Sequence, residues 1–485
     1  MGRKHQSKHN EKENKIHQQK RKELTNLVQK LLNLTTVFFG ATNQNKLWDH
    51  HKEIIPLTKE IMSYEHSSYK EQKKSRDENI EKYVMWLKEH EVEFEGLEIA
   101  SFEDYEYGLK ALKSFPEDSL LLTIPKQVMM TEIDAQKSDL SEFIKDDVLM
   151  QNMPNVTLAL FLLFEKSKSD SFWKPYIDTL PESYSTVLYF DLEELAELKP
   201  SPTFESSMKL YTNIARQYSY LWLRINKSNQ PGLKNLKEIF TFENYRWAVS
   251  TVMTRQNHIQ LTDFTTTAFI PLWDMCNHEQ GKISTDFNKD GNRGECYAKR
   301  DFKPGEQVFI FYGARPNADL FVHNGFVYPN NDYDYITLTM GVSSSDALRE
   351  LKMSLLTKLG LNNVTQYRLY KKGTIIMPEL LAFIRIFNMN KDELEKWSKS
   401  GLPSDLVSSD ESSAKEVGCD IDARAYNYLL TRCNILISAY KKLEVKDADT
   451  QNRKNIKLLK ECEVQILEDA IEYINKTIEQ FKPIA

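Results

Sequence analysis

The chain has 485 residues, and its 41% hydrophobic and 11% aromatic residues are typical of a folded protein, which excludes a largely disordered one. A formal net charge of -6 at pH 7 argues against a dedicated nucleic-acid-binding protein. The five cysteines include no CxxC pair, so we expect a reducing compartment and no zinc framework. Because no apolar signal region or membrane-spanning run is evident, we expect a cytoplasmic protein, with the nucleus as an additional location to consider.

Residues 1–75 are polar and predict a solvated N-terminal extension. Their basic run, Lys20-Arg21-Lys22, has a nuclear-localisation role as its alternative interpretation. Within this segment, "LTNLVQKLLNL" has its apolar residues at helical spacing. We therefore expect a helix there that could dock on the body of the protein.

From residue 77 onward the pattern predicts regular structure. "ENIEKYVMWLKEHEV" predicts an amphipathic helix, and "YEYGLKAL", "EDSLLLTIP" and "KQVMMT" predict short strands. A helical pattern follows at about 131–245. Strands return at "TTAFIPLW", "GECYAKRDF" and "EQVFIFYG", with Pro304-Gly305 as a turn between the last two.

Beyond about residue 345 the chain again reads as helical. Leu348, Leu351, Leu355 and Leu359 recur on one helical face, and the last helix repeats apolar residues from Ile456 to Ile478. The α+β architecture predicted here is a β-rich catalytic core at 76–330, split by the helical insertion. An all-helical C-terminal domain at 331–485 follows it.

One segment resembles a calcium-binding loop without completing it. In "DFNKDGNRGECY", Asp286, Asn288 and Asp290 match the opening of an EF-hand loop, but Tyr297 stands where a bidentate Glu is required. The flanking residues also predict strands and not helices. We therefore expect a polar hairpin turn.

The densest group of chemically capable side chains lies between residues 255 and 278. A metal site built on Asp274, His278 and the distant His323 is conceivable, although no spacing demands it, and we expect no metal. A Cys276 nucleophile would need His278 to converge on it as a base. Because Cys276 lies in an apolar run, a small core residue is the plainer interpretation.

A third interpretation comes from resemblance. "FIPLWDMCNHEQG" followed by "RDFKPGEQVFIFYGAR" resembles the paired motifs of SET-domain methyltransferases, an Asn-His loop and a segment ending in Tyr-Gly. The helical insertion and the helical C-terminal domain are similar to those of the Rubisco large-subunit methyltransferase branch. "RWAVSTVMTRQN" and "PLWDMCNH" resemble the actin-histidine methyltransferases of that branch. The resemblance covers roughly residues 76–485.

The resemblance implies S-adenosylmethionine as the cofactor and actin as the protein substrate of a monomeric enzyme. The residues that it places at the cofactor are Arg76, Glu106, Tyr107, Arg255, Asp274, Met275, Cys276, Asn277, His278, Asn324, Gly325 and Phe326. Glu106 departs from the family, which more usually has Gly there. A side chain at this position restricts the backbone angle φ.

The choice of a histidine acceptor agrees with the residue types. An imidazole with a pKa of ~6.5 is mostly neutral at pH 7 and needs orientation more than a strong base. The resemblance gives this role to Asn257 and Tyr312, with Trp273 and Arg315 as substrate contacts.

Each of these residues has a plainer alternative role. Asn257 could cap a helix, Trp273 could be core, and Arg315 could pair with Asp319. The functional alternatives are a lysine methyltransferase of the same branch and a non-catalytic SET-like binding module. Intact Asn257 and Tyr312 favour an enzyme, and Asn257 together with Trp273 favours histidine over lysine.

Overall fold

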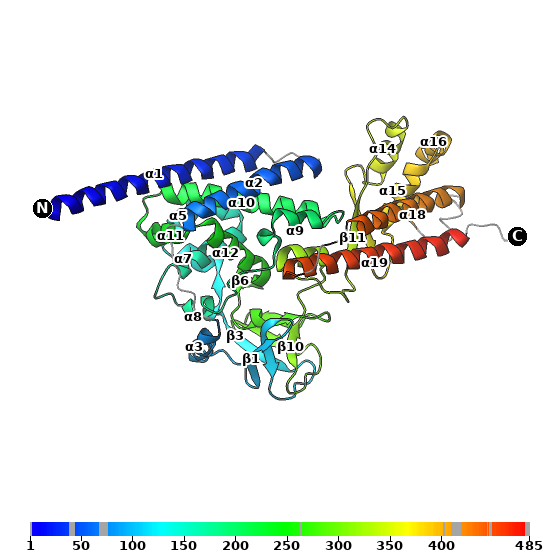
Figure 1. Ribbon diagram of the computed structural model, residues 1–485. Coiled ribbons are helices and arrows are strands. Elements are labelled where there is room, and N and C mark those ends of the chain that lie inside the picture. The colour runs from blue at the N-terminus through cyan, green and yellow to red at the C-terminus, as the bar shows by residue number, and fades with distance from the viewer. Residues whose placement is uncertain are drawn as a thin grey trace. The chain divides into compact units, whose positions relative to one another are not determined.

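A computed structural model gives the structure of the chain (Figure 1). It describes residues 2–37, 44–66, 76–261, 264–400, 403–408, 419–443, 445 and 449–480. The chain divides into two units, each of which is described by itself. The first comprises Met1–Tyr189 and Ser207–Gly313, and the second comprises Phe190–Ser206 and Ala314–Ala485. None of the described helices is long and apolar enough to cross a membrane.

The first unit begins with two long helices, α1 (Gly2–Val37) and α2 (Gln44–His66), which run side by side in Figure 1. Val28 and Leu31 of α1 and Ile54 and Ile61 of α2 are fully buried. The predicted docking helix is therefore confirmed by one buried face, while most of the other side chains of residues 18–37 remain exposed or partly exposed. The apolar residues are sparse, but they fall on one face of each helix and bury it.

A buried carboxyl group attaches α2 to the helical insertion. Glu65 accepts a hydrogen bond from the Tyr218 hydroxyl (2.5 Å) in α10 (Thr203–Lys227). It also accepts one from the backbone N–H of Phe242 (2.9 Å), the first residue of α12 (Phe242–Arg255). Burial raises the pKa of Glu65 to about 7, although these two hydrogen bonds oppose the shift. The N-terminal helices thereby support the start of α12.

This contact predicts a pH-dependent stability. The folded-state pKa of Glu65 lies above its unfolded value, so its contribution is complete below about pH 4.5 and is lost as the pH rises through about 7. We expect Glu65→Gln to flatten the decline in the free energy of unfolding between pH 5 and pH 8. Urea denaturation of both proteins at several pH values measures this difference. Identical pH dependences would contradict the prediction.

Three small sheets form the β-rich part of the first unit. Their strands are β1 (Leu97–Phe102), β2 (Glu106–Ala111), β3 (Leu120–Pro125), β4 (Met130–Thr131), β5 (Asn257–Gln260), β6 (Thr265–Phe269), β7 (Asn277–His278), β8 (Thr285–Asn288), β9 (Arg293–Tyr297) and β10 (Gln307–Ile310). The sheet orders are β1-β2-β10-β7, β3-β9-β8 and β4-β6-β5. In the first sheet, β10 pairs antiparallel with β2 and parallel with β7. This arrangement places β2, β10 and β7, which come from different parts of the chain, side by side.

The helices of the first unit precede and interrupt these strands. Besides α1 and α2 they are α3 (Arg76–Glu89), η1 (Lys126–Val128), α4 (Glu132–Lys137), α5 (Ser141–Lys145), α6 (Val148–Asn152), α7 (Pro154–Lys166), α8 (Lys174–Ile177), η2 (Val187–Tyr189), η3 (Pro231–Leu233), α11 (Lys234–Ile239), α12 and η4 (Trp273–Met275). Helix α10 crosses the division between the units. Helix α7 is buried from Val156 to Glu165 and packs on α12, as expected of a helix that is apolar on all sides.

The predicted hairpin in "DFNKDGNRGECY" is confirmed. Strands β8 and β9 are antiparallel, and Asn288 pairs with Arg293 across the turn. The Asn288 side chain accepts a hydrogen bond from the N–H of Gly291 (2.8 Å), and Asn292 has a positive φ of 47°. The polar residues therefore close a turn between strands.

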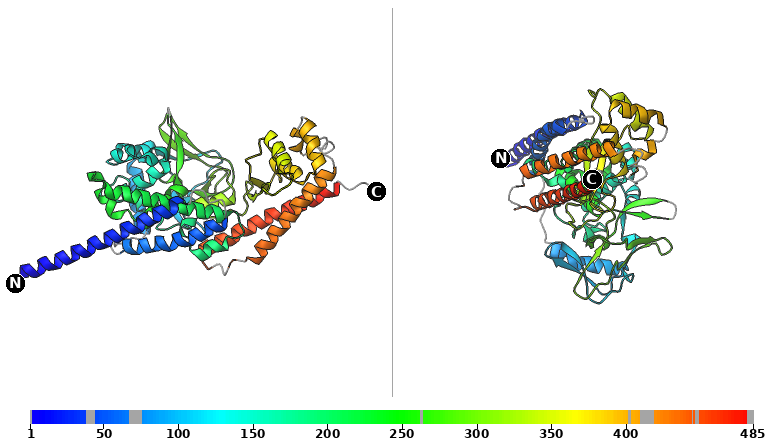
Figure 2. Two further views of the ribbon diagram at one scale, coloured as in Figure 1. Left: turned by 90° about the horizontal axis from the view of Figure 1, so that it is seen from above. Right: turned by 90° about the vertical axis from the view of Figure 1, so that its right-hand side faces the viewer.

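The second unit contains α9 (Leu192–Glu197), α13 (Asn317–Asp319), η5 (Leu320–Asn324), β11 (Tyr335–Thr339), α14 (Arg349–Lys358), β12 (Gln366–Tyr370), α15 (Pro378–Asn388), α16 (Lys391–Ser400), η6 (Pro403–Leu406), α18 (Cys419–Lys442) and α19 (Gln451–Gln480). The last two helices lie side by side in Figure 2. The α+β class is confirmed, but the prediction that the C-terminal domain is all-helical is wrong. Strands β11 and β12 form an antiparallel pair whose alternate residues are buried, with Ile336 opposite Leu369 and Leu338 opposite Tyr367.

The second unit also includes residues 190–206, although the helical pattern predicts that they belong to the insertion at about 131–245. Ser201 donates a hydrogen bond to Glu463 of α19 (2.8 Å), which also accepts one from Tyr440 (2.8 Å). Lys460 of α19 donates to the backbone oxygens of Glu197 (3.0 Å) and Lys199 (2.9 Å). These buried polar contacts attach the segment to α19, which explains the difference from the predicted boundaries.

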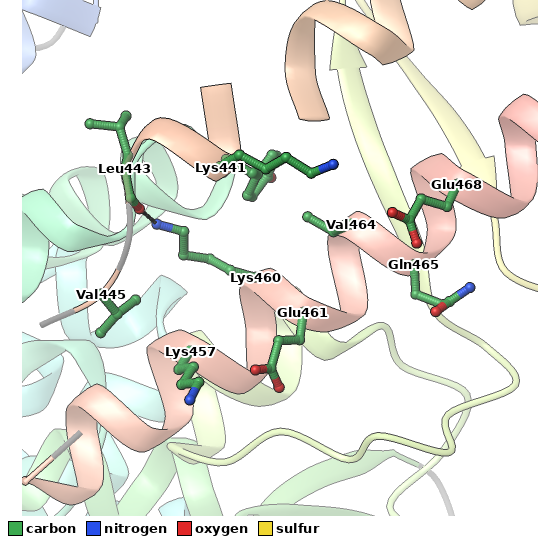
Figure 3. A pocket seen from close by; sticks show the side chains of 10 residues that line it. Lys441, Leu443, Val445, Lys457, Lys460, Glu461, Val464, Gln465 and Glu468 are labelled. Atoms are coloured by element: carbon green, nitrogen blue, oxygen red, sulfur yellow. Dashed lines mark hydrogen bonds between the residues drawn. The ribbon is translucent and has the colours of Figure 1, made fainter. Parts of the chain in front are cut away.

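Lys460 also lines a pocket of about 600 Å³ between the end of α18 and α19. Figure 3 shows Lys457, Glu461 and Glu468 around this pocket, with Lys460 directed to the backbone oxygen of Leu443. Acidic and basic side chains are mixed along its wall, so the pocket has no single preferred charge for a ligand.

Candidate functional site

All but four of the predicted site residues lie in the first unit. Those in the first unit are Arg76, Glu106, Tyr107, Arg255, Asn257, Trp273, Asp274, Met275, Cys276, Asn277, His278 and Tyr312. The four in the second unit are Arg315, Asn324, Gly325 and Phe326.

The turn that carries Trp273 to His278 begins with a strained residue. Leu272 has φ 72° and ψ -48°, a conformation that is rare for a residue with a branched side chain. The turn ends in β7, whose residues Asn277 and His278 pair with Phe309 and Ile310 of β10. The turn is therefore fixed at both ends, as a site that must hold a defined geometry requires.

Arg255, the last residue of α12, is bound to this turn. Its Nη1 donates to the backbone oxygen of Asp274 (2.6 Å) and lies 3.6 Å from Asp274 Oδ1. The Tyr176 hydroxyl donates to Asp274 Oδ2 (2.5 Å). Burial opposes the charge on Arg255, but the Asp274 carboxylate and the neighbouring tyrosine hydroxyls together outweigh it and hold the pKa of Arg255 above its usual value. Arg255 is therefore a buried cation that ties α12 to the turn.

Tyr312 is bonded both to the His278 ring and to the main chain of the turn. The N–H of Tyr312 donates to His278 Nδ1 (3.2 Å), and the Tyr312 hydroxyl donates to the backbone oxygen of Cys276 (2.7 Å). Burial raises the pKa of Tyr312, so its hydroxyl stays protonated near neutral pH. Tyr312 is consequently suited to donating or accepting hydrogen bonds and not to serving as a base.

The same contacts disfavour Cys276 as a nucleophile. Its side chain is 1% exposed, and a hydrogen bond with the Cys296 thiol, together with burial, raises its pKa well above the usual value. His278 Nδ1 already accepts the N–H of Tyr312. A thiol that stays protonated is a weak nucleophile, so Cys276 is a core residue here.

Asn277 fixes the start of β2 against the turn. Its Nδ2 donates to the backbone oxygen of Tyr107 (3.0 Å). A Cβ atom added to Gly108 would lie 3.0 Å from the same Nδ2 and would also collide with Gln307 Nε2. Gly108 is therefore required for the close approach of β2 to the turn.

Arg76, Glu106 and Tyr107 line a pocket of about 560 Å³. Arg76 Nη1 lies 3.0 Å from Glu106 Oε2, and the Arg76 guanidinium lies over the Tyr107 ring, 4.7 Å from its centroid. Glu106 has φ 57°, the left-handed conformation that glycine adopts most readily. The backbone at Glu106 therefore has a conformation that is unusual for a residue with a side chain, at the position where the sequence predicts a restricted φ.

Asn257, the first residue of β5, lies two residues beyond the last residue of α12, and the plainer cap interpretation describes part of its role. Its Nδ2 donates to the backbone oxygen of Arg255 (3.0 Å), which the helix leaves without an internal partner. This contact fixes the orientation of the amide, so that Oδ1 is the atom left to accept a hydrogen bond from a ligand. Trp273 is 6% exposed and contacts the backbone near Gly294, so most of its indole is core.

In the second unit, Arg315 contacts Asn324. Its Nη1 donates to Asn324 Oδ1 (2.7 Å) and its Nη2 to the backbone oxygen of Asp319 (3.4 Å). The neighbouring Gly325 has a positive φ of 78°, and its oxygen accepts a hydrogen bond from Asn455 of α19 (2.7 Å). The predicted substrate and cofactor residues of this unit therefore share one hydrogen-bonded loop.

Sequence reasoning missed Tyr176 and Asn455, which hold predicted site residues in place. Tyr176 donates a hydrogen bond to the Asp274 carboxylate, and Asn455 donates one to the backbone oxygen of Gly325. Both are polar residues on helices and distant in sequence from the residues that they contact. The only signal in the sequence is a polar group inside an otherwise apolar pattern.

Several features of the described site fit a bound polar cofactor. Arg255 Nε and Asp274 Oδ1 are buried without a hydrogen-bond partner in the described part of the chain. A buried polar atom without a hydrogen bond destabilises the fold unless a ligand or a water molecule supplies the missing partner. The adjacent pocket offers a guanidinium, carboxylates and an aromatic ring. Across the same described ranges, no group of three or more His, Cys, Asp or Glu is arranged to hold a metal ion.

Two protein families match the chain. Residues 106–313 match the SET domain, and residues 343–481 match the Rubisco LSMT substrate-binding domain. Two solved structures share the fold, one titled as Rubisco LSMT bound to AdoMet and the other as the SET domain of LSMT bound to lysine and AdoHcy. The first has a TM-score of 0.66 and 20% identity over 83% of this chain and 93% of that one. The second has a TM-score of 0.68 and 20% identity over 84% and 93%.

Curated relatives are closer in sequence. An actin-histidine N-methyltransferase of Gallus gallus is 36% identical over 460 residues, which cover 93% of this chain and 77% of the relative. The enzyme of that name from Danio rerio is 35% identical over 459 residues, with the same coverage of both chains. With this identity over most of both sequences, the chain belongs to the actin-histidine N-methyltransferase family of SET-domain proteins.

Proposed function

We propose that this protein transfers the methyl group of S-adenosylmethionine to the tele nitrogen of one histidine of actin. The family supports this reaction, and the amide of Asn257 is the structural observation that carries it. Because Nδ2 of Asn257 is committed to the Arg255 oxygen, Oδ1 can accept the N–H of an imidazole. If that N–H is on Nδ1 of the substrate ring, the lone pair of Nε2, the tele nitrogen, is free to attack.

S-adenosylmethionine supplies, when bound, a methyl group on a positively charged sulfur. Its chemical groups fit the residues available: Arg76 for the carboxylate, and the turn held by Arg255, with the main chain at Tyr107 and His278, for the remaining polar groups. The protein's part is to align the imidazole with the methyl group and to exclude water, because alignment provides much of the acceleration in such a displacement.

No strong base is required in this scheme. A neutral imidazole already carries the attacking lone pair near pH 7. Tyr312, whose pKa is raised by burial, remains a neutral hydroxyl that contacts the Cys276 oxygen. Its role is to shape the pocket beside the turn, not to remove a proton.

The acceptor is tested with substrate. We expect purified actin, incubated with the protein and labelled cofactor, to gain methyl groups on histidine by mass spectrometry. Matched actin peptides in which only the acceptor is changed from His to Lys then compare the two chemistries. Faster methylation of the Lys peptide would contradict this proposal and favour a lysine methyltransferase.

The pH dependence provides an independent expectation. With histidine as the acceptor, the rate should rise through the imidazole pKa near ~6.5 and then level off. With lysine it should continue to rise toward alkaline pH unless the pocket strongly lowers the amine pKa. Single-turnover rates between pH 5.5 and pH 9.5 distinguish these profiles. A rate that still climbs tenfold per pH unit above pH 8 would contradict a histidine acceptor.

Asn277 is expected to support cofactor binding through Tyr107. Asn277→Ala removes the hydrogen bond to the Tyr107 oxygen, and we expect cofactor affinity to fall by about 0.5–1.5 kcal/mol. Calorimetry with S-adenosylhomocysteine measures the change. Asn288→Ala, which removes a bond to Glu295 in the β8–β9 hairpin, is the matched control and should leave affinity unchanged. Equal affinity in all three proteins would remove Asn277 from the binding site.

A further inference from the structure

Glu106 forms an ion pair in the lining of the first-unit pocket. Its Oε2 lies 3.0 Å from Arg76 Nη1, and its side chain is 76% exposed whereas that of Arg76 is 15% exposed. The guanidinium of Arg76 is also held by Nε, which donates to the Thr179 oxygen (2.9 Å), and by the Tyr107 ring at 4.7 Å. Arg76 is thus fixed in place, and Glu106 occupies part of its donor edge.

Acidic residues outnumber basic ones in the lining of this pocket. Arg76 is the one cation among the described lining residues, and Asp77, Glu103, Glu106 and Glu182 are acidic. Burial, with repulsion from Arg255, lowers the pKa of Arg76, so its cationic form gains from a nearby anion. A ligand with one carboxylate therefore has a single cationic partner at this wall.

We propose that Glu106 competes with the carboxylate of the bound cofactor for Arg76, and thereby weakens the binding of both S-adenosylmethionine and its demethylated product. This inference rests on the proposed function, which supplies the ligand. It assigns to this chain a residue that sets cofactor affinity.

The conformation of Glu106 makes the competition possible. A residue with φ 57° directs its side chain differently from one in an extended strand, and a glycine here would leave Arg76 without this carboxylate. Because the Glu106 side chain is largely exposed, its ion pair is weak and can open when a ligand enters. Glu106 therefore reduces affinity without blocking the pocket.

The charge is tested with Glu106→Gln, which keeps the length of the side chain. We expect S-adenosylhomocysteine to bind this variant about two- to fivefold more tightly than the unmodified protein, as follows from the strength of an exposed ion pair. The probe 5′-methylthioadenosine, which has no carboxylate, should bind both proteins equally. Calorimetry at one fixed salt concentration measures all four affinities.

Glu103→Gln is the matched variant, because Glu103 lines the same pocket without an ion pair to Arg76 among the described contacts. It should tighten S-adenosylhomocysteine binding less than Glu106→Gln does. Equal gains in the two variants, a gain for 5′-methylthioadenosine, or no gain for S-adenosylhomocysteine would each overturn the competition. Failure of the unmodified protein to bind S-adenosylhomocysteine would instead overturn the proposed cofactor, and this inference with it.

Discussion

Arg385→Ala is expected to lower the free energy of unfolding of the second unit by about 3–5 kcal/mol, because it leaves a buried carboxylate without its partner. Arg385 in α15 and Asp422 in α18 are each 1% exposed, and Arg385 Nε lies 2.6 Å from Asp422 Oδ1. Nη1 of Arg385 also donates to the backbone oxygens of Leu406 (2.8 Å) and Ser408 (2.7 Å). One guanidinium therefore joins two helices and the segment that follows η6.

Hydrogen exchange of α15 and α18 measures this loss within the second unit. Arg424→Ala is the matched control, since its ion pair with Glu393 is partly exposed and should contribute at most about 1 kcal/mol. Replacing Arg385 and Asp422 together with apolar residues of similar size should recover much of the stability. Equal destabilisation by Arg385→Ala and Arg424→Ala would contradict the burial argument.

Asn257→Ala is expected to slow methyl transfer by about one to two decades, which corresponds to a lost orienting hydrogen bond of ~1.5–3 kcal/mol. The reason is that a misaligned imidazole loses the geometry on which the displacement depends. Cofactor affinity should stay nearly unchanged. Single-turnover rates and calorimetry on the same protein measure the two quantities separately.

The cap contact of Asn257 requires its own control. Asn257→Asp keeps an oxygen acceptor but removes the donor to the Arg255 oxygen. If orientation of the substrate sets the rate, the Asp variant should retain more activity than the Ala variant. If the two variants are equally slow, the cap of α12 is the cause, and an unchanged rate in Asn257→Ala would exclude both roles.

The strands of the catalytic core could be predicted because their signals are local. "YEYGLKAL" and "EQVFIFYG" carry the strand pattern within a few residues, and they form β2 and β10. The crowded stretch from Arg255 to His278 was also visible in the sequence, and the structure brings Arg255 against Asp274. The assignment of roles to these residues came from family resemblance, since residue types alone left metal and nucleophile alternatives open.

The remaining features depend on contacts between distant residues. The apolar stripe of α1 is diluted by polar residues, so its burial is visible only when Val28 and Leu31 meet their partners. Strand β11 was hidden because its five residues pair with a strand that begins far along the chain, at Gln366. The ion pair of Glu106 with Arg76 joins positions 30 residues apart, which no local pattern encodes.

The discontinuity of the second unit determines how this protein can be divided. Ser201 and Glu463 are 262 positions apart, so their contact cannot form during synthesis until α19 has left the ribosome. A fragment of residues 314–485 would lack the oxygens of Glu197 and Lys199 that Lys460 contacts. A chimera that exchanges the C-terminal domain between relatives would therefore also need to exchange residues 190–206, because the two segments form one folded unit.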